Sequence, residues 1–319
     1  MMIRFWGCAV FLSAAIAALP GCRGVSGPVA GGNGVMLPAT SSNQDLLYVV
    51  HVEGRGVRRR EVVSIVTFPQ GSPVATISNL YEPNGICSDG SGNVWVVAYR
   101  SSWNVYEFAH GGTKPIAEIP MPKRAVGGSC AVDPTTGNLA VEDRDSAIKG
   151  MIDVWPGARS GKPTVYRVPF EPVALTYDDQ GNLFSDGIIG STALFVFGEL
   201  AAGHSRFKVI QLHEPTGVPG GLQFDGQYVA VETGGIGGKP RIYVLSVSSS
   251  GVQVVDTLRF GTMYFEAWFC IEGDLLGGMA TQHGNRVDLW PYPSGGHPTQ
   301  TLERFDQIRG MTISRASPG

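Results

Sequence analysis

The sequence has few charged residues and no excess of either sign. Asp, Glu, Lys and Arg make up 16% of its 319 residues, and the formal net charge is −3. Nucleic-acid-binding domains present clustered basic charge, so we expect no nucleic-acid partner. Helical periodicity is also missing, although 43% of the residues are hydrophobic. The chain is therefore predicted to be a globular protein that buries a large core without helices.

A hydrophobic run of comfortable membrane-spanning length is missing as well. Residues 5–19 are apolar and follow Arg4, but the run is short, so residues 1–22 are predicted to be a signal peptide. The sequence LPGC at 19–22 resembles a bacterial lipobox, which implies lipidation of Cys22. The alternative is a plain secretory signal cut at the small residues 15–18. Both interpretations export the protein, and the lipobox places it in the cell envelope, on the periplasmic or outer surface.

Residues 23–44 are rich in Gly, Ser and Pro and lack any strand or helix pattern. Such composition predicts a flexible linker. The domain boundaries are therefore 1–22 for the signal, 23–44 for the linker and 45–319 for one folded domain. Contact with the membrane would be through the lipid anchor only, and we expect a monomer.

Cysteine is scarce in the folded domain. Five cysteines reduce to three once Cys8 and Cys22 are assigned to the leader, and Cys87, Cys130 and Cys270 lack metal-site spacing. Cys87 and Cys130 occupy the same register of successive repeats. An oxidising compartment could join them in a disulfide, and the alternative is two small buried residues.

What the sequence does contain is a repeat of about 45 residues. GICSDGSGN at 85–93, GSCAVDPTTGN at 128–138 and VALTYDDQGN at 173–182 each precede an apolar strand. A further alternating segment and a turn rich in Gly, Pro or Ser follow, and then a fourth apolar strand. Four strands in each such unit predict a propeller blade. The Asp and Gly of the first turn are expected to be structural, with Asp capping backbone donors and Gly supplying positive φ.

Counting the units gives six blades. Five complete units run from about 83 to 303, while residues 46–78 hold only three strands and residues 309–314 supply the missing inner strand. The predicted fold is therefore all-β, a six-bladed β-propeller of four-stranded antiparallel blades. The C-terminal strand pairs into the first blade and removes open sheet edges.

The motifs GNVWVV, GNLAVE and GNLFSD, between glycine-led inner strands, resemble the NHL-repeat group of six-bladed propellers. Shape relatives of that group are gluconolactonase-type hydrolases and streptogramin lyases, and its members include binding, sensor and enzymatic proteins. The common NHL form, with an Asp and a basic residue after the strand, is only partly present. The resemblance therefore implies a fold and leaves the function open.

Connectivity predicts where a ligand would bind. Hairpins between strands one and two and between strands three and four open on one face, whereas longer, dissimilar connections share the other face, so the second face is the expected ligand face. The candidates near the channel on this face are carboxylates with an amide, an imidazole and a guanidinium. They are Glu82, Asn84, Glu142, Asp143, Glu171, Asp186, Glu232, Glu266, His283 and Arg309.

Two functions follow from this surface, and a purely structural propeller is the third alternative. The first is a binding module for an envelope protein, a glycan or a small molecule, which needs no cofactor. The second is a metal-dependent hydrolase or lyase, in which Glu82, Asn84, Asp186 and Glu232 would hold a divalent metal. The competing interpretation of these carboxylates is a solvated or salt-paired ring.

Several other residues are expected to be structural. His110, His204 and His297 recur in outer hairpins and look like exposed turn residues. Trp155 and Trp290 fill the repeat position that Phe108 and Phe197 occupy, so they should pack between blades.

Overall fold

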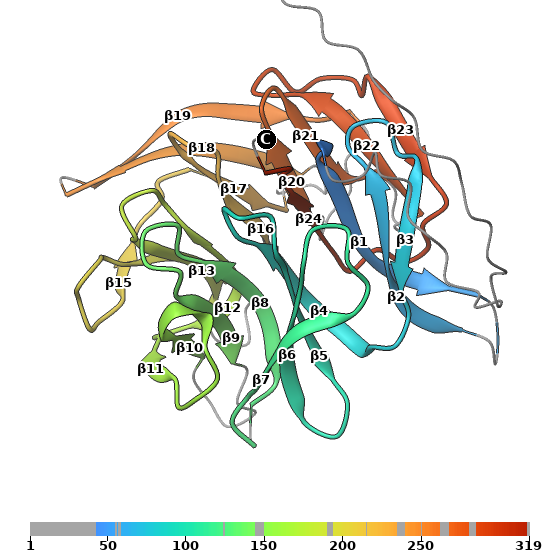
Figure 1. Cartoon of the computed structure of the whole chain (residues 1–319). Coiled ribbons are helices and arrows are strands. Elements are labelled where there is room, and N and C mark those ends of the chain that lie inside the picture. Colours follow the sequence, from blue (N-terminus) through green and yellow to red (C-terminus); the bar gives the residue numbers. More distant parts are fainter. Residues whose placement is uncertain are drawn as a thin grey trace, which may run out of the picture. The chain divides into compact units, whose positions relative to one another are not determined.

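The computed structural model describes residues 43–317, except 55, 57–58, 124, 144–149, 190–193, 215, 235–239, 250, 262–267 and 281–284. In this part of the chain the strands form six four-stranded antiparallel sheets, which follow one another in a ring (Figure 1). The predicted six-bladed propeller is confirmed. No helix among the described residues is long and apolar enough to cross a membrane.

Each sheet is one blade. Blade 1 contains β24 (Gly310–Ser314), β1 (Leu46–Glu53), β2 (Arg60–Thr67) and β3 (Pro73–Ile77), from the axis outward. Blade 2 contains β4 (Tyr81–Ser88), β5 (Val94–Tyr99), β6 (Trp103–Phe108) and β7 (Pro115–Pro120). Blade 3 contains β8 (Gly127–Val132), β9 (Leu139–Asp143), β10 (Met151–Trp155) and β11 (Thr164–Arg167), with a 3₁₀ turn, η3 (Pro156–Ala158).

The other three blades have the same order. Blade 4 contains β12 (Glu171–Tyr177), β13 (Leu183–Ile189), β14 (Leu194–Leu200) and β15 (Lys208–Ile210). Blade 5 contains β16 (Pro219–Phe224), β17 (Val229–Thr233), β18 (Arg241–Ser248) and β19 (Gly251–Arg259). Blade 6 contains β20 (Phe269–Glu272), β21 (Leu275–Met279), β22 (Arg286–Pro291) and β23 (Gln300–Glu303).

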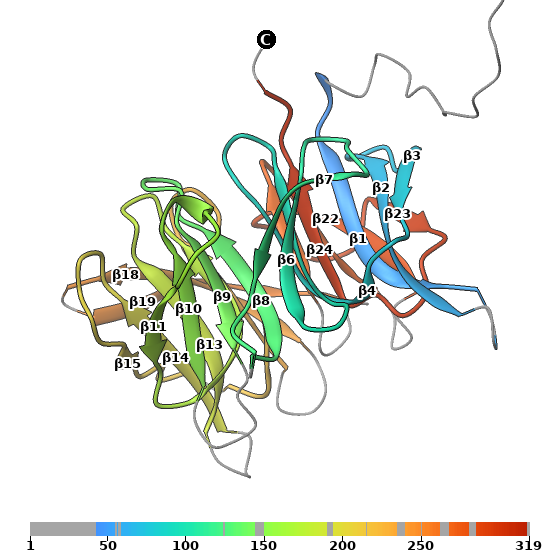
Figure 2. The ribbon, with the colours of Figure 1, turned by 60° about the horizontal axis from the view of Figure 1, so that its bottom comes forward.

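The C-terminal strand closes the ring, as predicted. β24 pairs antiparallel with β1, from Leu46 opposite Ser314 to Val50 opposite Gly310. The two strands lie side by side in both ribbon views (Figure 1 and Figure 2). His110 was expected to be an exposed turn residue, and this is wrong: it is half-buried, with Nδ1 2.6 Å from the Ser314 hydroxyl and Nε2 3.1 Å from the carbonyl of Gln44. It therefore fastens both ends of the domain to blade 2.

The hairpins between first and second strands use the predicted turn chemistry. Asp133 accepts hydrogen bonds from the N–H and the hydroxyl of Thr135, both at 2.8 Å, and Gly137 has a φ of 71°. Asp89, Asp178 and Asp225 cap the corresponding turns through the N–H groups two residues on. These acids are structural, because their oxygens satisfy local backbone donors.

The core lies between the blades. One cluster joins Trp95 and Val97 of blade 2 to Leu139 and Trp155 of blade 3. Trp155 and Trp290 are both fully buried, so their expected packing role is confirmed.

Strand direction sorts the connections into two faces. The hairpins after first and third strands share one side, the hairpin face, and the remaining connections share the opposite loop face. β1 is the second strand of its blade, so the chain enters the propeller at the hairpin face. Several loop-face connections lie outside the described residues.

Candidate functional site

The predicted ligand-face residues separate into three groups. Glu82, Glu171 and Arg309 are exposed, and the guanidinium of Arg309 pairs with Glu61 at 2.6 Å. Asn84 is half-buried and donates to the carbonyl of Gly127 at 2.8 Å. Glu266 and His283 lie outside the described residues, as does the lipidation candidate Cys22. Of the remaining candidates, Glu142, Asp186 and Glu232 are each the fourth residue of the second strand of a blade.

Four of the predicted carboxylates are buried inside the blades. The exposed fractions of Glu142, Asp143, Asp186 and Glu232 are 0%, 1%, 0% and 0%. They form no solvated ring, because water does not reach them.

Three of these acids serve the backbone of the inner strands. In blades 3, 4 and 5 the ladder between first and second strands shifts register, which leaves inner-strand N–H groups without a ladder partner. Glu142 accepts the N–H of Ser129 at 3.0 Å, Asp186 that of Ala174 at 2.9 Å and Glu232 that of Gly221 at 3.1 Å. Each buried acid therefore caps a β-bulge of its own blade.

The residue before each capped N–H is glycine where the capping acid is glutamate, and carries a side chain where the capping acid is the shorter aspartate. A Cβ on Gly128 would lie 2.3 Å from the Glu142 carboxylate, and one on Gly220 would lie 1.4 Å from that of Glu232. Blade 4 has Val173 at this point and the shorter Asp186 opposite it. Glycine is thus needed where the longer glutamate reaches over the inner strand.

Burial raises the pKa of Asp186 well above its ordinary value of 3.8, and the nearby charge of Glu142 adds to this rise. The hydrogen bond from Ala174 opposes the rise. Oδ2 of Asp186 has no hydrogen-bond partner within the described structure. The site consequently favours the protonated form of Asp186.

The metal hypothesis remains a prediction. Asp186 and Glu232 each use an oxygen on a backbone N–H, and Glu82 is exposed to solvent. Among the residues that the structure describes, no three His, Cys, Asp or Glu side chains come together as metal ligands. Glu266 and His283 belong to the undescribed connections, so the divalent metal is untested.

Cys87 and Cys130 form a disulfide in the structure, with their Cα atoms 5.6 Å apart. The bond joins β4 to β8, the inner strands of blades 2 and 3. Cys270 is a buried thiol, and burial raises its pKa to about 12. A thiol with so high a pKa is a poor nucleophile.

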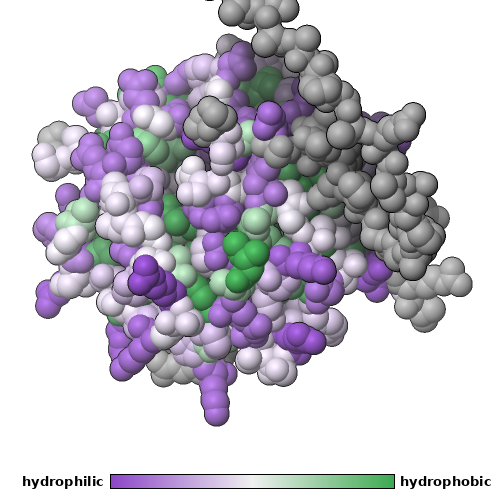
Figure 3. All heavy atoms as spheres, in the orientation of Figure 1, coloured by the Kyte–Doolittle hydropathy of each residue, from purple (hydrophilic) through white to green (hydrophobic). Residues whose placement is uncertain are grey.

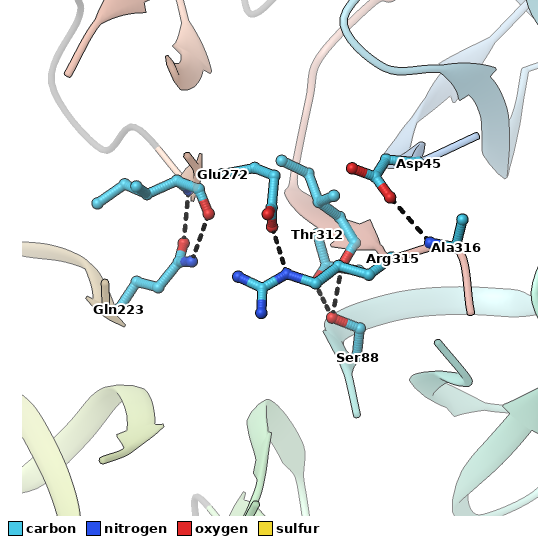
Figure 4. A network of polar contacts seen from close by, with 9 residues as sticks. Asp45, Ser88, Gln223, Glu272, Thr312, Arg315 and Ala316 are labelled. Atoms are coloured by element: carbon cyan, nitrogen blue, oxygen red, sulfur yellow. Dashed lines mark hydrogen bonds and ion pairs between the residues drawn. The ribbon is translucent and has the colours of Figure 1, made fainter. Parts of the chain in front are cut away.

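Polar side chains stitch the inner strands of neighbouring blades together. Leu175 donates to the hydroxyl of Ser129 at 3.2 Å, and Phe224 donates to that of Thr176 at 3.1 Å. Both amide atoms of Gln223 bond the backbone of Ile271 at 2.8 Å. Ser88 donates to the carbonyl of Ile313 at 2.7 Å, and its hydroxyl lies 3.1 Å from that of Thr312 (Figure 4). These polar groups of the channel wall therefore already have hydrogen-bond partners within the protein.

An aromatic cluster of one exposed and two half-buried rings lies on the loop face of blade 2. Tyr81 begins β4, Tyr99 ends β5 and Trp103 begins β6, so all three lie where these strands reach the loop face. The Tyr99 ring is centred 6.3 Å from Tyr81 and 5.6 Å from Trp103. Tyr81 is 60% exposed. Residue type alone did not single out these rings, because the repeat pattern explains an aromatic residue at a strand end equally well.

The hairpin face has cavities of its own. One has a volume of about 940 Å³ and lies between blades 2 and 3, against Asp133, Glu118 and Arg159. Another, the channel cavity, measures about 260 Å³ and is lined by the ends of all six inner strands, with Glu272 and Arg315 among the lining residues. In the view of Figure 3, hydrophilic residues cover most of the surface and hydrophobic ones form small separate patches. Sequence reasoning had placed the site on the loop face and did not predict these cavities.

Comparison with known proteins supports the fold alone. No protein-family model matches the sequence, and a search of curated proteins finds no match. A protein of unknown function from Bacteroides caccae has a similar structure, with a TM-score of 0.61 and 14% identity over 86% of this chain and 100% of its own. A functionally unknown protein from Desulfotomaculum acetoxidans has a TM-score of 0.55 and 13% identity, over 85% of this chain and 90% of its own. Hydrazine synthase from Kuenenia stuttgartiensis has a TM-score of 0.55 and 12% identity, over 82% and 80%.

Proposed function

We propose that the protein is an envelope-anchored binding module whose protein or glycan partner docks on the loop face at the aromatic cluster. The observation that carries this proposal is Tyr81, an aromatic ring that is 60% exposed and is centred 6.3 Å from the ring of Tyr99. Aromatic rings with one polar end are enriched at recognition surfaces, because they bury much area with few rotatable bonds.

Two further features agree with binding. The buried acids Glu142, Asp186 and Glu232 hold backbone N–H groups and so are engaged by the fold. The chain enters at the hairpin face. The aromatic cluster therefore lies on the face opposite to this point of entry.

The test compares two exposed apolar residues of the same blade. Tyr81 is 60% exposed on the loop face, and Ile116 is 59% exposed on the outer strand β7. Binding of the purified protein to envelope proteins and to an array of envelope glycans should fall about tenfold or more in Tyr81→Ser. Ile116→Ser should bind as the parent does. Equal binding by parent and Tyr81→Ser, with both proteins folded, would contradict the proposal.

A further inference from the structure

The channel cavity offers a binding site that is separate from the aromatic cluster. It measures about 260 Å³, and all of its lining residues belong to the described structure. Ligand pockets for drug-sized molecules span roughly 300–1,000 Å³, so this cavity suits a smaller molecule. Ser88, Thr176 and Gln223 already form hydrogen bonds to neighbouring inner strands. The charged residues of the lining therefore determine which ligand charges the cavity would bind.

Arg315 is the cation of this cavity. It follows β24, and its Nε donates to Oε2 of Glu272 at 2.6 Å, across to blade 6. Its side chain is 63% exposed, whereas that of Glu272 is 21% exposed. Within the described residues the two terminal nitrogens of Arg315 have no hydrogen-bond partner, and Figure 4 shows them pointing away from the carboxylate.

The second acid of the lining is already satisfied. Both oxygens of Asp89 accept hydrogen bonds within their own hairpin, from Ser91 and from Asn93. Glu272 uses only Oε2 on Arg315 in the described structure. The cavity thus presents one guanidinium edge and one carboxylate oxygen close together.

This pair selects a ligand with two charges. The terminal nitrogens of a guanidinium suit a carboxylate, which they bind with two parallel hydrogen bonds. A simple anion would be repelled by Glu272, while an ammonium group would be attracted to it. We propose that the channel cavity binds a small zwitterion of the α-amino-acid type, with its carboxylate on Arg315 and its ammonium group on Glu272.

Calorimetric titration of the full chain with each of the twenty L-amino acids tests this assignment. At least one should bind saturably. For that amino acid, the N-acetyl derivative and the decarboxylated amine should each bind about tenfold or more weakly, because each lacks one charge. If no amino acid binds, or if the N-acetyl derivative binds as well as the zwitterion, the proposal is overturned.

Variants connect the binding to these two side chains. Arg315→Gln and Glu272→Gln should each weaken it about 10- to 100-fold, and Arg315→Lys should weaken it less, since the charge remains. The matched control is Arg60→Gln, which breaks another 2.6 Å ion pair, with Glu53, away from the cavity. A thermal melt of each variant verifies folding. Unchanged affinity in folded Arg315→Gln would overturn the site, and Tyr81→Ser should leave it intact whether or not the loop-face proposal holds.

Discussion

Blades 3, 4 and 5 differ from blades 6 and 1 in how the inner strand meets the second strand. In the first group the ladder shifts register, and the fourth residue of the second strand is a buried acid: Glu142, Asp186 or Glu232. In the second group the described ladders are regular, and the fourth residue is Gly278 or Val49. The buried acids therefore accompany the bulges. A carboxylate in a propeller wall can be a backbone partner rather than a sign of catalysis.

Blade 2 refines this comparison. Its inner strand also shifts register, but the fourth residue of β5 is Val97. Here the inner strand itself carries the polar group, because Asn84 donates to the carbonyl of Gly127 in blade 3. Blade 2 therefore combines a register shift with no acid at this position, and the polar group of its inner strand bonds the neighbouring blade.

The largest effect is expected from removing one capping acid. Glu232→Leu leaves the N–H of Gly221 buried without an acceptor and should lower the free energy of unfolding by about 3 kcal/mol. Urea unfolding measures this change. Glu171→Leu, an exposed carboxylate of β12, should change stability by no more than about 0.5 kcal/mol. Similar losses for both variants would refute the capping role.

A smaller effect is expected from crowding the cap. Gly220→Ala places a Cβ 1.4 Å from the Glu232 carboxylate and should cost about 2 kcal/mol. Adding Glu232→Asp should recover part of this loss, because blade 4 combines a side chain at Val173 with the shorter Asp186. A double-mutant cycle in urea gives the coupling. If the stability losses of the two single variants add up to that of the double variant, the length of the acid and the glycine are not coupled.

The third prediction concerns the raised pKa of Asp186. The native state favours its protonated form, so the contribution of Asp186 to stability is fully present below 3.8 and is lost as pH rises from 3.8 through the folded pKa. Asp186→Asn keeps an acceptor for Ala174 and carries no charge. Melting temperatures across pH 5–9 should fall less steeply in the variant than in the parent. Parallel pH profiles would contradict the assignment.

Blade 1 should show the opposite and smallest pH response. Burial lowers the pKa of His51 below 6.5, against the hydrogen bond to Val52 and the charges of Glu53 and Asp306. The native state favours the neutral ring, so stability is lost as pH falls through 6.5 toward the folded pKa. His51→Gln should flatten the profile between pH 7 and 5. A parent profile already flat in this range would refute the prediction.

The repeat made the fold predictable from sequence. The turn Asp133 to Gly137 and its relatives recur at a fixed spacing, and the surplus strand at 309–314 matched the one missing from the first blade. Such features are local or periodic, so one chain contains enough information to place them.

The candidate site was less predictable, for identifiable reasons. From the sequence alone, Glu142 and Glu232 were assigned to the ligand face. The register shift of the paired inner strand, which gives each acid a backbone N–H to bind, cannot be recognised from the residues around the acid. The matching register of Cys87 and Cys130 did not fix the distance between their Cα atoms. The closeness of Arg315 to Glu272 depends on the packing of β24 beside β20, which brings residues 43 positions apart together at the channel.

Ring closure inside blade 1 also has a consequence for engineering. Leu46 and Ser314 are register partners, so the two ends of the folded domain lie next to each other at the hairpin face. A short turn could join them, as hairpins of 2–5 residues join other antiparallel neighbours. New ends could then be opened in another hairpin, and the resulting circular permutant would keep every blade while its break moved to a different sector of the ring.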